Sequence, residues 1–134
     1  MEQQKKILLV DDEPSLLAAL ERTLSRKGYR IITAPNGQNA ISLAKRHGPD
    51  LIIMDISMPG IGGEEVAAKL GEDPQTRNIP VIFLTGLFSR DQQQQRGHMI
   101  GGHIFVAKPV ETEALLQIIQ DRLAASAVAT PDQQ

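Results

Sequence analysis

The chain has 134 residues, a formal net charge of -2 at pH 7 and no cysteine. The length fits one domain with its own apolar core, and the lack of cysteine removes disulfides and thiolate metal ligands and suits a reducing interior. The charge gives no basic surface for nucleic acid, no segment has the roughly 18 apolar residues of a membrane span, and the polar start lacks a signal peptide's apolar core. We therefore expect a cytoplasmic domain that binds neither nucleic acid nor membrane.

The first part of the chain alternates strands with helices. A strand over residues 5–10 ends in a continuous apolar run, and Pro14 then fits the first turn of a helix whose leucines recur at helical spacing up to Lys27. Residues 29–34 form a shorter and less apolar strand, which we expect at an edge of a sheet. A second helix follows the turn at residues 35–37, with two alanines and a leucine facing inward.

A second continuous apolar run, Leu51 to Met54, ends on Asp55. Such a run indicates a strand buried on both faces, as in a parallel sheet, so the carboxylate of Asp55 has no packing reason to follow it. The next helix covers residues 64–70 and has two acids in its first turn, where the helix dipole favours them. Residues 71–78 form a polar loop.

The last part of the chain continues the alternation. A third apolar strand over residues 80–85 ends on a threonine instead of an acid. Residues 89–99 are expected to be helical, and their four glutamines indicate a solvated helix face. A short strand over residues 103–107 ends at Lys108, and a terminal helix runs over residues 111–123.

Strands that alternate with helices along the whole chain predict right-handed crossovers and a parallel α/β sheet covered on both faces. Five strands and five helices fit the length. We expect the doubly wound order 2-1-3-4-5 of the flavodoxin-like (βα)5 fold, with its switch point between strands one and three. Residues 1–125 form this domain, and the composition of residues 126–134 predicts a flexible C-terminal tail.

Polar side chains follow the expected strands at their carboxyl ends, where open parallel sheets bind ligands: Asp11, Asp12, Asp55, Thr85 and Lys108. Three clustered carboxylates repel one another and need a cation or protons, and an oxygen-preferring ion such as Mg2+ answers that need. A carboxylate there can attack phosphorus if the developing charge is neutralised. Lys108 can pair with a phosphate, and Thr85 can donate a hydrogen bond to it. The set predicts an aspartate that accepts a phosphoryl group.

With these motifs the chain resembles the receiver domain of bacterial two-component response regulators, similar to chemotaxis-type single-domain regulators, from about Lys5 to Leu123. The resemblance implies that Mg2+, with Mn2+ as an alternative, is held by the metal ligands Asp11, Asp12, Asp55 and the backbone carbonyl of Ser57. It also implies a phosphoacceptor, a catalytic lysine, a hydroxyl that is both catalytic and a switch, and a switch aromatic, namely Asp55, Lys108, Thr85 and Phe105.

The same resemblance implies the partners of the chain. A sensor histidine kinase or a histidine phosphotransfer protein donates the phosphoryl group, and a downstream protein of unknown identity docks on the fourth helix and fifth strand. A homodimer through the face of the fourth and fifth helices is also compatible with the resemblance. The chain is expected to be a switch that assists its own phosphotransfer and dephosphorylation, not an enzyme. Phe105 lacks the hydroxyl of a tyrosine, Ile104 replaces a common polar residue and Gly62 replaces a capping acid, and these departures concern the readout.

Three other functions are weighed against this one. A metal-dependent phosphohydrolase would place Asp-x-Asp after the first strand, whereas Asp11 and Asp12 are adjacent here and Asp55 follows the third strand. A pseudo-receiver that never carries phosphate is disfavoured because every chemical position is filled. Dinucleotide binding requires glycines where the first strand is followed by acids. Taken singly, Asp11 or Asp12 would more often cap the helix that starts at Pro14, and only their combination with Asp55 favours metal binding.

Overall fold

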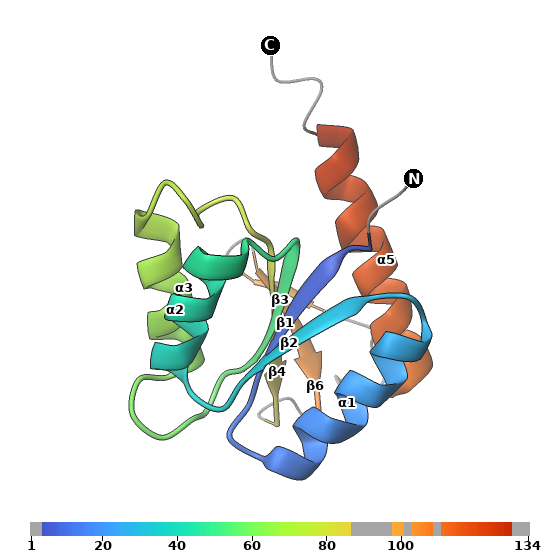
Figure 1. The fold of residues 1–134 in the computed structure, drawn as a ribbon, viewed down its shortest axis with the longest axis horizontal. Coiled ribbons are helices and arrows are strands. Elements are labelled where there is room, and N and C mark those ends of the chain that lie inside the picture. The colour runs from blue at the N-terminus through green and yellow to red at the C-terminus, as the bar shows by residue number, and fades with distance from the viewer. Residues whose placement is uncertain (1–3, 87–97, 101–102, 109–110, 130–134) are drawn as a thin grey trace.

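The computed structural model describes residues 4–86, 98–100, 103–108 and 111–129. Their strands form one sheet with helices on both faces (Figure 1). In chain order the elements are β1 Lys6–Val10, α1 Pro14–Arg26, β2 Arg30–Ala34, α2 Gly37–His47, β3 Leu51–Asp55, α3 Gly63–Glu72, β4 Val81–Thr85, β5 His98–Ile100, β6 His103–Ala107 and α5 Thr112–Ala129. Among the described residues, no helix combines the length and the apolar character needed to cross a membrane.

The strand order confirms the predicted fold class. The sheet has the order β2-β1-β3-β4-β6-β5. Strands β2, β1, β3, β4 and β6 pair in parallel, which is the predicted order 2-1-3-4-5, and β2 lies at an edge as expected. Because β1 and β3 are neighbours, the residues that follow them lie at the switch point of the sheet.

Strand β5 corrects the sequence prediction, which has five strands and places His98 and Met99 at the end of a helix. In the structure these two residues belong to β5, which pairs antiparallel with β6. The rest of that predicted helix, residues 89–97, lies outside the described residues, whose helices are α1, α2, α3 and α5. Three residues are too few to show a strand period, although the pair Gly101-Gly102 between two strands is itself a hairpin signal.

The end of the last helix is a second correction. Helix α5 continues past the predicted end at Leu123 and reaches Ala129. Composition explains the error, because alanine is the best helix former and fills most of this stretch. The division into a domain over residues 1–125 and a flexible tail over residues 126–134 stays a prediction.

Two apolar clusters hold the helices on the sheet. Successive strand residues point to opposite faces, so β1 and β3 contribute to both clusters, which explains their continuous apolar runs. The cluster under α1 and α5 contains Ile7, Leu9, Leu20, Leu24, Leu51, Ile53, Ile82, Leu84, Val106, Leu115, Leu116, Ile118 and Ile119. The cluster under α2 and α3 contains Leu8, Val10, Ala34, Ala40, Ala44, Ile52, Met54, Val66, Leu70, Val81 and Phe83.

Helix α3 begins very close to the backbone of β3. A Cβ atom at Gly63 would lie 2.6 Å from the carbonyl oxygen of Asp55, well inside normal contact distance. The Gly63 N–H donates a hydrogen bond of 3.0 Å to the carbonyl of Ile56. As the sequence indicates, the start of this helix has no side-chain cap, since Gly62 is the N-cap residue. Gly63 therefore allows the first turn of α3 to pack directly against the strand that ends at Asp55.

We expect Gly63→Ala to lower the free energy of unfolding by about 1–3 kcal/mol, because the added methyl group must displace α3 from β3. Gly71→Ala in the same helix is the matched control. No atom lies within 4 Å of a Cβ there, so the higher helix propensity of alanine should stabilise the fold by about 0.5–1 kcal/mol. Urea denaturation measures both changes. Equal effects of the two substitutions would contradict the close approach.

Candidate functional site

Three polar side chains are buried at the carboxyl edge of the sheet. Asp11 follows β1, Asp55 ends β3 and Thr85 ends β4, with exposed fractions of 2%, 6% and 2%. Each follows strand residues that are packed on both faces, and the N–H of Asp11 extends the sheet by donating to Ala34 at 3.2 Å. The backbone therefore fixes where these polar groups lie.

The carboxylates of Asp11, Asp12 and Asp55 lie close enough together to hold one cation. One oxygen from each lies within 4.8 Å of the other two, and Asp12 is exposed whereas Asp11 and Asp55 are buried. A cation among them would have protein oxygens on one side and solvent on the other. Oxygen donors of this kind suit Mg2+ or Mn2+, so the donor set fits the predicted ion.

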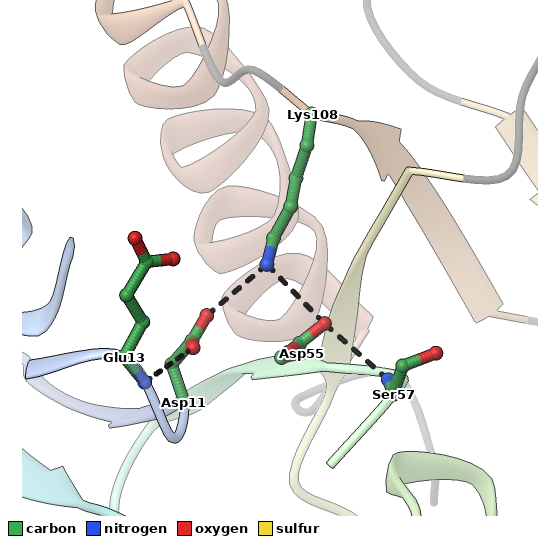
Figure 2. A network of polar contacts seen from close by, with 5 residues as sticks. All are labelled: Asp11, Glu13, Asp55, Ser57 and Lys108. Atoms are coloured by element: carbon green, nitrogen blue, oxygen red, sulfur yellow. Dashed lines mark hydrogen bonds and ion pairs between the residues drawn. The ribbon is translucent and has the colours of Figure 1, made fainter.

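Lys108 reaches from the end of β6 into the same group, and its ammonium lies between two carboxylates (Figure 2). The Nζ atom is 3.4 Å from Oδ2 of Asp11 and 3.4 Å from Oδ1 of Asp55. The backbone N–H of Lys108 also donates to the carbonyl of Thr85 at 2.8 Å. The lysine is thus attached to β4 through its backbone and to β1 and β3 through its side chain.

Backbone N–H groups orient the two buried carboxylates. The N–H of Glu13 donates to Oδ1 of Asp11 at 2.9 Å, and the N–H of Ser57 donates to Oδ1 of Asp55 at 3.3 Å (Figure 2). Glu13 is the N-cap residue of α1. The alternative in which Asp11 or Asp12 caps this helix is therefore wrong, which leaves both side chains available to the site.

The site holds more negative than positive charge. Burial raises the pKa of Asp11, and the Asp55 carboxylate adds to the rise, while the Glu13 N–H and Lys108 offset it only in part. Burial alone would lower the pKa of Lys108, but the carboxylates of Asp11 and Asp55 more than compensate and raise it. An added cation would relieve this imbalance.

Phe105 lies apart from the carboxylates, on the face of the sheet that α2 and α3 cover. Its ring stacks on Phe83, with centroids 5.0 Å apart and planes at 26°. His103, to which the sequence gives no site, meets Phe83 edge-on at 5.3 Å and 79°. Sequence reasoning placed Phe83 only in a buried strand, because the neighbour of a side chain across a sheet depends on strand register.

The structure thus brings together four of the predicted site residues, Asp11, Asp12, Asp55 and Lys108. Thr85 ends the strand next to β3, and Ser57 follows Asp55 by two residues, so both lie at the same edge of the sheet. Sequence reasoning missed the contribution of Gly63, which supports the backbone of Asp55. The glycines before α3 were a signal, but the close contact itself is tertiary.

Comparison with known proteins identifies the family. The response regulator receiver domain model matches residues 7–120. Protein PilH of Pseudomonas aeruginosa is 36% identical over 121 residues, covering 89% of this chain and 98% of PilH. The polar-differentiation response regulator DivK of Brucella anthropi is 32% identical over 119 residues, covering 89% of this chain and 96% of DivK.

A solved response regulator from Desulfuromonas acetoxidans has the same fold, with a TM-score of 0.77 and 35% identity over 90% of this chain and 98% of that one. The matched residues 7–120 span every part of the site, from Asp11 to Lys108. The chain therefore belongs to the response regulator receiver domain family and is a signalling switch of two-component systems.

Proposed function

We propose that Asp55 accepts a phosphoryl group from a sensor histidine kinase or a histidine phosphotransfer protein. The observation that carries this proposal is the environment of its carboxylate, which is buried and accepts the Ser57 N–H and the Lys108 ammonium on one oxygen, Oδ1. The other oxygen is the one we expect to attack. A bond then forms from it to phosphorus as the bond between phosphorus and the donor nitrogen breaks.

The neighbours of Asp55 would bind the metal ion and the phosphoryl oxygens. Asp11, Asp12, Asp55 and the backbone carbonyl of Ser57 would hold Mg2+ or Mn2+, which when bound supplies positive charge beside the phosphoryl oxygens. Lys108 pairs with a second phosphoryl oxygen, and its ammonium needs only a small movement from its place between Asp11 and Asp55. The Thr85 hydroxyl donates a hydrogen bond to another phosphoryl oxygen. The same groups assist dephosphorylation, so no separate substrate is turned over.

Phosphorylation adds roughly -1.5 to -2 charge at Asp55, which draws Lys108 and Thr85 toward the phosphoryl group. The backbone bond from Lys108 to Thr85 joins these two responses, and Phe105 lies on the strand that ends at Lys108. We infer that the surface around Phe105 and the fourth helix of the sequence prediction (residues 89–99) changes. A downstream protein, or a second copy of the chain, binds there. A nearly complete switch requires about 5.5 kcal/mol of coupling. Family membership supports a cytoplasmic location.

Asp55→Asn should abolish phosphorylation, because an amide does not attack phosphorus as a carboxylate does. Incubating the wild-type chain with magnesium and acetyl phosphate should add the mass of one phosphoryl group, and the variant should gain nothing. Glu64→Gln, which alters an exposed acid at the start of α3, is the control and should be phosphorylated normally. A gain that persists in Asp55→Asn would disprove the acceptor, and steady turnover of an aryl phosphate would favour a phosphohydrolase.

Asp11→Asn should stabilise the metal-free fold and remove its response to magnesium. Burial raises the pKa of Asp11, so the folded state holds this proton more tightly than the unfolded chain, and ionised Asp11 lowers stability at neutral pH. The wild-type chain instead gains stability from bound metal, by RT ln(1 + [Mg2+]/Kd). Urea midpoints should therefore favour the variant in chelator and the wild type in saturating magnesium. A wild-type midpoint that ignores magnesium would argue against the metal site.

A further inference from the structure

The ring of Phe105 has a fixed support in the core. Phe83 is 1% exposed and belongs to the apolar cluster under α2 and α3, whereas Phe105 is only partly buried against that cluster. The two rings are stacked with centroids 5.0 Å apart, and His103 and Phe83 form a T-shaped contact. Phe83 is therefore the buried member of this aromatic group, and Phe105 is the partly exposed one.

Strand register explains the stack and connects it to the site. Phe83 and Phe105 are Cα partners on the parallel strands β4 and β6, so their side chains point to the same face of the sheet. On its other side Phe83 is the Cα partner of Met54, which directly precedes Asp55. Thr85 follows Phe83 by two residues and ends the same strand. Met54, Phe83 and Phe105 thus form a row across the sheet. The row lies one residue before Asp55 on β3 and two residues before Thr85 on β4.

We propose that Phe83 is a positioning residue of the phosphorylation switch, which holds Phe105 in one of its two positions by ring stacking. The proposal rests on the roles of Asp55 and Phe105 given above. Stacking of aromatic rings changes an equilibrium by about two- to tenfold. Because coupling between sites is reciprocal, a change in the equilibrium of Phe105 changes the affinity of Asp55 for a phosphoryl group by up to the same factor.

The competing explanation is that Phe83 only fills the core. A filler residue would alter the free energy of unfolding when replaced, and it would leave the ligand affinity of the folded chain unchanged. A positioning residue alters that affinity, and it does so only while the ring of Phe105 is present. A double-mutant cycle separates the two explanations, since it isolates the part of each effect that depends on the other residue.

The experiment measures the affinity for beryllofluoride, a phosphoryl analogue, by calorimetry in saturating magnesium. The four proteins are the wild type, Phe83→Leu, Phe105→Leu and the double variant. Leucine keeps position 83 apolar and removes the ring. We expect Phe83→Leu to change the affinity by about two- to tenfold in the wild-type background and by less than about 1.5-fold in the Phe105→Leu background. Phe83→Met replaces Phe83→Leu if the latter does not fold.

Ile52→Val is the matched control, because it trims the same apolar cluster and leaves both rings in place, and its affinity should equal that of the wild type. An unchanged affinity in the Phe83 variant, or an equal change in both backgrounds, would overturn the positioning role and leave the proposed function intact. Failure of the wild-type chain to bind beryllofluoride would instead overturn the proposed function. The two failures are therefore distinguishable.

Discussion

Two buried carboxylates share one lysine, and much of the molecule follows from that arrangement. Asp11 and Asp55 are almost inaccessible to solvent, and the ammonium of Lys108 lies 3.4 Å from each. One positive charge does not balance two negative ones with Asp12 at the rim, and the raised pKa of Asp11, which burial chiefly causes, shows that the ionised form of this buried carboxyl is unfavourable. The surplus of negative charge persists because adjacent parallel strands end at the same edge of the sheet. A bound divalent cation would restore the balance.

The strands that gather these charges also connect them to the surface. The Lys108 N–H donates to Thr85 at 2.8 Å, which joins the ends of β4 and β6, and two residues before Thr85 on β4, Phe83 stacks on Phe105. A movement of Lys108 toward a phosphoryl group therefore acts on the strand that carries Phe105. Packed interiors have little free space and change between discrete arrangements, so we propose that such a movement would favour a second position of the ring over gradual deformation.

The strand order and the polar residues at the strand ends could be predicted, because both have local signals in the sequence. A continuous apolar run that ends on an acid, as at Leu51 to Asp55, identifies a buried strand and its exit together. The features that escaped prediction depend on distances across the fold or on very short segments. Strand β5 has three residues and shows no period, the contact of Gly63 with Asp55 joins separate elements, and the stack on Phe83 depends on register. The alanine-rich end of α5 was misjudged because small residues suit both tails and helices.

The apolar core holds the strand ends that carry the carboxylates in place. Val10 and Met54, which precede Asp11 and Asp55, are 1% and 0% exposed, so the backbone at both strand ends is fixed by packing on either side. Gly63 adds a helix turn against the carbonyl of Asp55, which limits movement of β3. The carboxylates cannot relieve their repulsion by moving apart, and their imbalance is kept until a ligand removes it. In a looser strand end the added charge of phosphorylation would be absorbed by local movement. Under the proposed function, the movement would instead fall to Lys108 and to β6, the strand that carries Phe105.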